Sequence, residues 1–326
     1  MRVAAYSLIV AALLLPPASE CSAAEGKSRN LWQLPPPAAT HRANFELGRL
    51  LFYDTRLSER GNRACASCHN PGLGWADGVS LSEGLRNPMS RHTPSLINIG
   101  YQKSFFWDGR ATSLEEAILQ HLRAPSTLQE SDPDHLTEAI RAISGYRKLF
   151  KGKPPTDERI AAALAAYLRE ATIQHSTPFD RWSAGDETAI SAAAQRGWRL
   201  FNGKGRCVSC HTSPLFSDSR YHNTGINSID PGRFEVSRNQ AQQHAFRTPS
   251  LRGIAETAPY MHTGSKADLR EVLAFYNQGG DRPDAGNELR PLRLTTRELN
   301  DLLAFLQTLS APGSEVAIPR LPPSGE

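Results

Sequence analysis

The chain has 326 residues, with 37 lysines and arginines against 33 aspartates and glutamates and a formal net charge of +4. Hydrophobic residues make up 39% of the sequence, and this composition excludes a disordered or a collagen-like chain. The positive charge is spread along the sequence without a block of five basic residues. It therefore argues against nucleic-acid binding and against a polybasic membrane-binding patch.

The first 24 residues have the pattern of a secretory signal peptide. Arg2 supplies a positive charge, residues 3–15 form an apolar run, and residues 22–24 are small. The run is too short to cross a bilayer as a helix, and small residues at its end suit signal peptidase. We predict cleavage after Ala24, export to the periplasm and no membrane span. The alternative is a buried N-terminal helix.

The mature chain contains two Cys-x-x-Cys-His motifs. They consist of Cys65, Cys68 and His69 and of Cys207, Cys210 and His211, and the fifth cysteine, Cys21, leaves with the signal peptide. This spacing is the attachment signature of c-type haem, in which two thiols bind one porphyrin and the histidine ligates its iron. A redox dithiol or a zinc ribbon is the alternative, but neither requires a histidine after each pair. We predict two covalent c-type haems with His69 and His211 as proximal ligands.

The predicted elements occur twice along the chain. A short amphipathic helix precedes each haem motif, over residues 46–52 and 195–201, and a Thr-Pro-Ser-Leu segment follows each motif, at residues 93–96 and 248–251. Sixteen residues after each threonine lies a glycine, Gly109 or Gly264, and five residues further Leu114 or Leu269 opens a helical pattern. Each half ends with an apolar-periodic helix, over 158–171 and 296–309. No segment shows convincing strand-like alternation.

This repeated order predicts an all-α protein with two cytochrome c-like domains related by duplication, each carrying one haem. We place the N-terminal domain at residues 25–175 and the C-terminal domain at residues 176–310. Residues 176–187 are expected to link them, and the proline-rich residues 311–326 to form a flexible tail.

Besides the haem motifs, several segments of the chain resemble the bacterial di-haem cytochrome c peroxidases and their MauG-like relatives. They are Phe106-Trp107-Asp108-Gly109-Arg110-Ala111, Leu114-Glu115-Glu116, Thr248-Pro249-Ser250-Leu251-Arg252 and Thr257-Ala258-Pro259-Tyr260-Met261-His262. The match runs from about Trp32 to Leu309. The resemblance implies two c-type haem domains with a calcium ion between them. It also implies that one haem reacts with hydrogen peroxide, while the other receives electrons from a donor protein.

The resemblance assigns roles to residues between the haems. Trp107 matches a tryptophan that relays electrons, and the alternative for it is an ordinary buried aromatic residue. Thr257 and Pro259 match residues whose backbone oxygens bind the calcium. The family's asparagine ligand is replaced by His92, and imidazole is a poor ligand for a cation that prefers oxygen. The expectation of one calcium ion is therefore weaker than that of two haems.

The resemblance places the sixth ligand of the second iron fourteen residues after His262, at Tyr276. Many family members have methionine there, whereas the MauG-like members have tyrosine. A tyrosinate ligand favours higher oxidation states of iron than a thioether does. The alternatives are that Met261 ligates this iron, or that Tyr276 is an ordinary helix residue.

At the first haem the sequence departs from its relatives. The resemblance implies a distal histidine, a glutamine and a glutamate, but these positions hold Leu85, Ala117 and Thr127. None of these three can serve well as the acid or base that moves a proton between the oxygens of peroxide. This loss puts ordinary peroxidase turnover in doubt.

The internal repeat suggests which residue defines the first pocket instead. When the halves are aligned at Gly109 and Gly264 without gaps, His121 falls on Tyr276. His121 is therefore a candidate ligand or distal base for the first iron, with an exposed helix histidine as the alternative. Gln120 and Glu130 are weaker candidates.

Two functional hypotheses follow. The leading one is a periplasmic di-haem enzyme of the MauG-like branch, in which peroxide reacts at the His69 haem and Trp107 shares the oxidising equivalents with the His211/Tyr276 haem. Its reductant would be a small cytochrome c, a cupredoxin or a side chain of a partner protein, and the enzyme could be a homodimer. The rival is a di-haem electron carrier, which needs a strong ligand such as His121. The missing glutamine and glutamate favour the carrier, and Tyr276 favours the enzyme.

Overall fold

The computed structural model describes residues 31–83, 90–124, 134–282, 286–311 and 316–324. The predicted signal peptide, Leu85, Thr127 and Glu130 lie outside these described residues. No helix in the described ranges is both long and apolar enough to cross a membrane.

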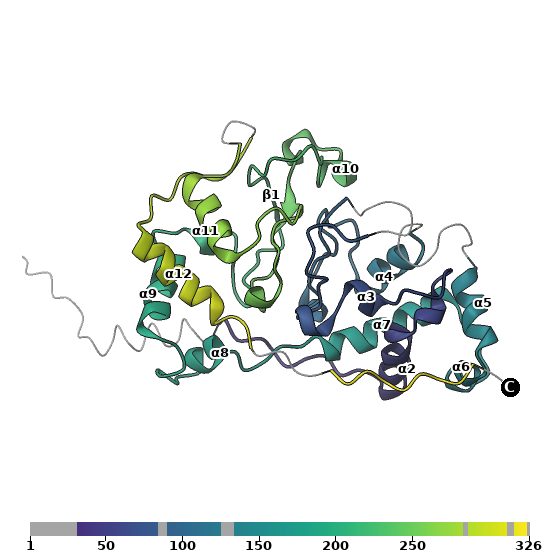
Figure 1. Ribbon diagram of the computed structural model, residues 1–326. Helices are drawn as coiled ribbons and strands as arrows, with labels where there is room; N and C mark the ends of the chain where they lie inside the picture. The colour runs from purple at the N-terminus through teal and green to yellow at the C-terminus, as the bar shows by residue number, and fades with distance from the viewer. Residues whose placement is uncertain (1–30, 84–89, 125–133, 283–285, 312–315, 325–326) are drawn as a thin grey trace, which may run out of the picture.

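The molecule is rich in helices and has two hydrophobic cores, which form the two lobes in Figure 1. The first lobe contains α2 (Arg42–Tyr53), α3 (Cys65–Cys68), α4 (Leu114–Leu122), α5 (His135–Ala142), α6 (Ser144–Leu149) and α7 (Asp157–Ala171). The second contains α8 (Pro178–Ser183), α9 (Ala192–Asn202), α10 (Phe234–Ser237), α11 (Leu269–Gln278) and α12 (Thr296–Gln307). Short 3₁₀ helices cover Thr55–Leu57, Pro71–Leu73, Ile99–Tyr101, Cys207–Ser209, Gln240–Gln242 and Ile254–Glu256.

Strands are nearly absent from the described residues, as the sequence predicts. The one exception is an antiparallel pair of two-residue strands, β1 (Tyr221–His222) and β2 (Phe246–Arg247), in which Tyr221 pairs with Arg247. Two residues are too few to produce an alternating pattern in the sequence.

Two of the predicted helices begin directly after a residue whose side chain caps the helix. Ser113 precedes α4, and its side chain accepts a hydrogen bond from the backbone N–H of Glu116. Asp268 precedes α11 and accepts in the same way from Glu271. Such side chains satisfy backbone donors that have no partner within the helix. Both helices therefore begin at the leucines that the repeat predicts.

A pair of helices crosses closely in each lobe. α2 packs on α7, and α9 packs on α12. A Cβ atom added at Gly48 of α2 would lie 2.0 Å from the carbonyl oxygen of Ala163, and one added at Gly197 of α9 would lie 2.0 Å from that of Asp301. Each crossing therefore needs a glycine, and these helices lead into the two haem motifs.

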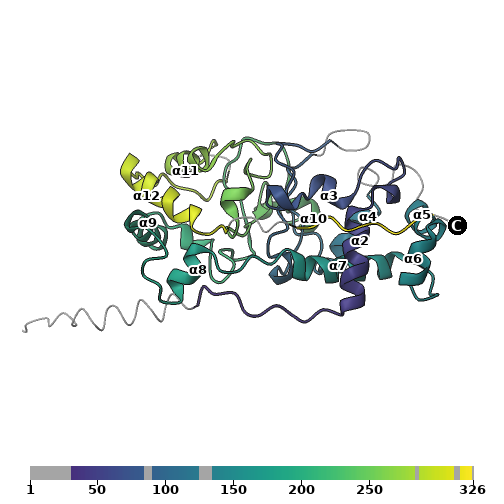
Figure 2. The same ribbon diagram turned by 60° about the horizontal axis from the view of Figure 1, so that its bottom comes forward.

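Two segments pack more firmly than the sequence suggests. The expected linker contains α8, whose Phe179 and Trp182 are buried in the second core, and Trp32 joins the same core. The expected tail continues along the first lobe, where the Arg56 guanidinium donates to the carbonyl oxygen of Pro322 at 2.9 Å. Figures 1 and 2 show the described part of this segment passing α2 toward α6. Residues 316–324 are thus docked on the first lobe rather than loose.

Candidate haem sites

The first haem motif presents a histidine prepared for metal binding. Cys65 and Cys68 lie on α3, and His69 follows directly. The Nδ1 atom of His69 lies 3.1 Å from the carbonyl oxygen of Trp75. A hydrogen bond from Nδ1–H to a carbonyl fixes the ring and leaves Nε2 for a metal. Burial lowers the pKa of His69, which keeps the imidazole neutral as a ligand must be.

The second motif repeats this arrangement. Cys207 begins a 3₁₀ helix, and the Nδ1 atom of His211 lies 2.8 Å from the carbonyl oxygen of Phe216. Burial lowers the pKa of His211 as well. The two histidines therefore have the same backbone partner type and the same available nitrogen.

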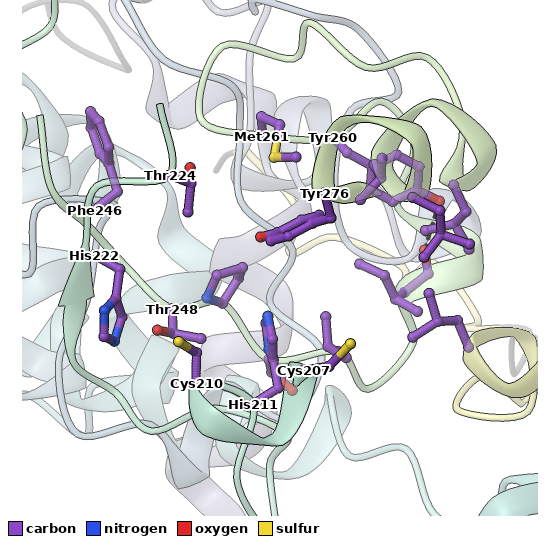
Figure 3. A pocket seen from close by; sticks show the side chains of 18 of the residues that line it. Cys207, Cys210, His211, His222, Thr224, Phe246, Thr248, Tyr260, Met261 and Tyr276 are labelled. Atoms are coloured by element: carbon purple, nitrogen blue, oxygen red, sulfur yellow. Dashed lines mark hydrogen bonds between the residues drawn. The ribbon is translucent and has the colours of Figure 1, made fainter. Parts of the chain in front are cut away.

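Tyr276 lies across a cavity from His211. The cavity has a volume of about 500 Å³, and Cys207, Cys210, His211, Met261 and Tyr276 are among the residues that line it. Figure 3 shows the Tyr276 ring, carried by α11, above the His211 ring. Burial raises the pKa of the Tyr276 hydroxyl. A tyrosinate here therefore needs a cation beside it, which a ferric haem would supply.

Two further polar groups in this cavity fit a porphyrin with its acidic side chains. His262 is buried, and its Nε2 atom has no hydrogen-bond partner among the described residues. The Arg247 guanidinium is also buried, and it donates to the carbonyl oxygen of Phe106 at 3.2 Å. Burial lowers the pKa of Arg247 to about 10. A buried cation is costly without an anion, so a haem carboxylate would suit this position.

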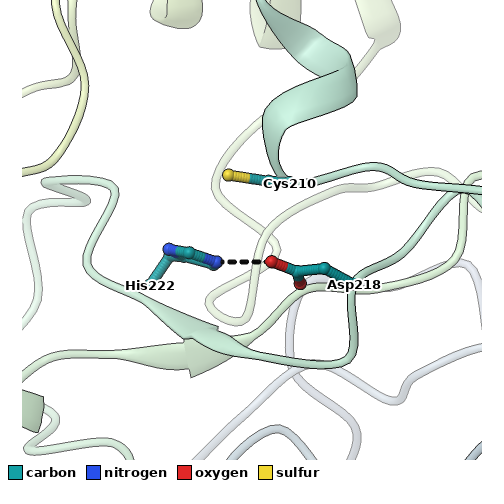
Figure 4. A group of neighbouring side chains, drawn as sticks. All are labelled: Cys210, Asp218 and His222. Carbon is teal, nitrogen blue, oxygen red and sulfur yellow. Dashed lines mark hydrogen bonds and ion pairs between the residues drawn. The ribbon is translucent and has the colours of Figure 1, made fainter.

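A second group of polar residues lies beside the second motif. Cys210, Asp218 and His222 (Figure 4) have possible ligand atoms within 4.8 Å of one another. His222 also lies 2.7 Å from a carboxylate oxygen of Glu288. Because Cys210 belongs to the haem attachment motif, we do not assign this group to a separate metal.

The loop that carries Trp107 is held by both lobes. Arg91 pairs with Asp108 at 2.5 Å and with Asp230 at 2.6 Å. Arg233 donates to the carbonyl oxygens of Asp108 and Gly109 at 2.9 and 2.8 Å. The loop is therefore fixed by charged contacts that join distant parts of the chain.

Trp107 itself lies against the cavity that His211 and Tyr276 line, called the second cavity below. It lines that cavity, and its ring centroid lies 6.3 Å from that of His262 in an edge-on arrangement. Its indole Nε1 donates to the carbonyl oxygen of His92 at 2.7 Å. The indole is thus held in a fixed orientation beside the predicted second haem.

His121 faces the first motif. It lies near the end of α4, and its ring centroid is 6.3 Å from that of His69, with 57° between the ring planes. Burial, His69 and Arg110 together lower the pKa of His121 to about 4. Ala117 on the same helix is buried in the first core and offers no polar group. The exposed helix histidine considered as the alternative does not describe this position.

One residue at the expected calcium site lacks the side-chain oxygen that an asparagine would supply. Thr257, Pro259 and His92 all line the same cavity. The Nδ1 atom of His92 lies 2.8 Å from the carbonyl oxygen of Val79, and its own carbonyl oxygen accepts from Trp107. Calcium takes six to eight oxygen ligands. His92 offers no side-chain oxygen, and its backbone oxygen is already bonded.

The structure thus brings together most of the residues that the sequence singles out. Tyr276 and His211 line one cavity, and the ring centroids of His121 and His69 lie 6.3 Å apart. Sequence reasoning missed His262 and Arg247 as possible haem contacts. Both stand in or beside the repeated motifs, but only the folded chain shows that each is buried in the cavity.

Comparisons with known proteins identify the family of the chain. The family model for the di-haem cytochrome c peroxidases matches residues 42–188. The methylamine utilization protein MauG of Methylorubrum extorquens is 40% identical over 286 residues, which cover 85% of this chain and 80% of that protein. The cytochrome c551 peroxidase of Nitrosomonas europaea is 32% identical, with 86% of this chain and 83% of that protein covered.

Solved structures show the same relationship. A MauG-like protein associated with microbial copper homeostasis superposes with a TM-score of 0.79 at 32% identity, covering 85% of this chain and 93% of that one. The di-haem peroxidase BthA of Burkholderia thailandensis has a TM-score of 0.74 at 24% identity, covering 86% and 91%. This second likeness concerns the fold alone.

Proposed function

Because the chain belongs to the di-haem cytochrome c peroxidase family, we propose that it is a periplasmic oxidoreductase that reduces hydrogen peroxide at its first haem and takes electrons through its second. Each haem supplies a redox-active iron when it is bound, and an iron with an accessible sixth position can react with peroxide. The overall reaction consumes one peroxide, two protons and two electrons and releases two waters.

The residues of this chain divide the work between the two sites. Cys65, Cys68 and His69 hold the first haem, and Cys207, Cys210 and His211 hold the second. Tyr276 is the second ligand at the latter site, because it faces His211 across the same cavity. A negatively charged oxygen ligand favours oxidised iron, which suits an enzyme that stores oxidising equivalents.

The single observation that carries this proposal is the position of Trp107. The indole lines the second cavity, and its loop is fixed by contacts from both lobes. An aromatic ring that is held rigidly beside one redox site can take part in electron transfer to a second. The electrons would come from a small cytochrome c, from a cupredoxin or from an oxidisable side chain of a partner protein.

The experiment uses the exported holoprotein with both haems attached. We expect reduced cytochrome c or a reduced blue-copper protein to be oxidised when peroxide is added. Trp107→Phe should slow this oxidation while the haem content stays unchanged. Trp182→Phe is the matched control, because its indole also donates a hydrogen bond, to Glu187 at 3.1 Å, but lies in the second core. Failure of the wild type to oxidise either donor, together with failure to react with peroxide alone, would refute the proposal.

One observation favours a second function, that of a di-haem electron carrier. The ring centroids of His69 and His121 lie 6.3 Å apart, and an iron with two histidine ligands transfers electrons without binding a substrate. A holoprotein that exchanges electrons with both donors yet never reacts with peroxide would be this carrier.

A further inference from the structure

The two lobes share local contacts in the segments that follow their haem motifs and lead to α4 and α11. Ser95 donates to the carbonyl oxygen of Gly74 at 2.6 Å, and Ser250 donates to that of Leu215 at 2.7 Å. An isolated bridge joins Phe105 to Ala111 in one half and Tyr260 to Lys266 in the other. Ser95 and Ser250, Phe105 and Tyr260, and Ala111 and Lys266 are all separated by the same number of residues. Only the carbonyl partners, Gly74 and Leu215, have a different separation.

The same spacing continues into the helices. Phe106 and Met261 share left-handed backbone angles, with φ of 65° and 70°. The capping residues Ser113 and Asp268 each accept from the backbone N–H three positions later. α4 and α11 therefore start in register, and His121 occupies on α4 the position that Tyr276 occupies on α11.

The distance between the histidines fits a shared metal ion. Imidazole nitrogens bind metals at about 2.0–2.1 Å, so two rings on opposite sides of one ion have centroids about 6 Å apart. The observed separation between His69 and His121 is 6.3 Å. His69 already turns Nδ1 to the carbonyl oxygen of Trp75, which leaves Nε2 for the metal.

The helix that carries His121 is anchored on both sides of this residue. Leu114, Ile118 and Leu122 are buried in the first core, and α4 packs against α7. Glu115 forms two hydrogen bonds with Arg169, at 2.5 and 2.8 Å. At the other end, Arg123 donates to Asp157 at 2.9 Å. A side chain on such a helix keeps its place, unlike one on a movable loop.

We propose that His121 is the sixth ligand of the first haem iron, so that this haem is low-spin at rest with two histidine ligands. The proposal rests on the proposed function, since it assumes the first haem, and it adds a requirement to that function. Peroxide can reach the iron only when it displaces an imidazole that a packed helix holds in place. This makes the first site different from an open peroxidase pocket.

The test measures the spin state of the resting ferric holoprotein by electron paramagnetic resonance and optical spectroscopy. We expect two low-spin haems in the wild type. His121→Gly should convert one haem completely to high-spin and leave the His211/Tyr276 signal unchanged. Added imidazole should restore the low-spin signal, because it can occupy the space of the lost ring. A purely structural role for His121 would give no such rescue.

Controls separate the ligand from the helix and from the enzyme activity. Arg123→Gln weakens the end of the same helix but keeps the imidazole, so it should remain low-spin. A wild type with a high-spin haem that His121→Gly leaves unchanged would overturn the proposal, as would a His121→Gly protein that stays low-spin. If the spin state changes as expected and neither protein reacts with peroxide, the ligand assignment stands and the peroxidase function fails.

Discussion

The helix crossing at Gly197 gives a prediction whose size follows from the structure. Gly197→Ala should improve the helix preference of α9 by about 1 kcal/mol. However, the new Cβ atom would lie 2.0 Å from the carbonyl oxygen of Asp301 and 2.7 Å from the Cβ of Phe305. Since nonbonded heavy atoms pack at about 3.5–4.0 Å, α9 and α12 would have to separate by more than about 1 Å.

Overpacking of a core lowers the free energy of unfolding by about 1–3 kcal/mol. Because the helices must move apart by this much, we expect the Gly197→Ala cost to lie at the upper end of that range. After the gain in helix preference, we expect a net loss of about 2 kcal/mol in the free energy of unfolding. Gly48→Ala should behave in the same way, because it meets the carbonyl oxygen of Ala163 at the equivalent crossing.

The assay is guanidinium unfolding of the holoprotein, followed by far-ultraviolet circular dichroism. The matched control is Arg199→Ala, an exposed position on the same helix, which should change the free energy of unfolding by less than about 0.5 kcal/mol. A Gly197→Ala protein that unfolds at a higher denaturant concentration than the wild type would refute the reasoning. It would mean that helix preference decides and that the helices do not cross so closely.

The sequence predicts those parts of the fold that depend on local chemistry. Serine and aspartate cap helices through a local hydrogen bond, as Ser113 and Asp268 do here. The starts of α4 and α11 can therefore be predicted from the sequence alone. The haem attachment motifs can be predicted for a similar reason, since the porphyrin itself fixes the spacing of the two cysteines and the histidine. The pairing of His121 with His69 follows from the repeat.

Features that depend on contacts between residues far apart in the sequence cannot be predicted in this way. The tail residue Pro322 accepts a hydrogen bond from Arg56, which lies 266 positions earlier in the chain. Phe179 and Trp182 make a linker into part of the second core. Arg247 donates a hydrogen bond to the carbonyl oxygen of Phe106 in the other lobe. None of these contacts has a period or a spacing that a sequence pattern could show.

The remaining predictions concern ligands. Tyr276→Phe should change the spectrum of the second haem and raise its reduction potential, whereas Met261→Leu should leave both unchanged; the reverse result would contradict the assignment. The intact mass of the exported protein should equal the chain from residue 25 plus two haems, about 1.2 kDa, and a single haem would refute the reading of the motifs. Finally, metal analysis of the holoprotein should find no stoichiometric calcium, and a calcium chelator should not change its spectra or its thermal unfolding. The reason is that the His92 imidazole bonds to the carbonyl oxygen of Val79 and that its own carbonyl oxygen is taken by an indole. His92→Asn restores a side-chain oxygen, which calcium prefers, so this variant should gain calcium-dependent thermal stability. One calcium ion per wild-type chain would show that backbone oxygens suffice at this site and that His92 does not prevent calcium binding.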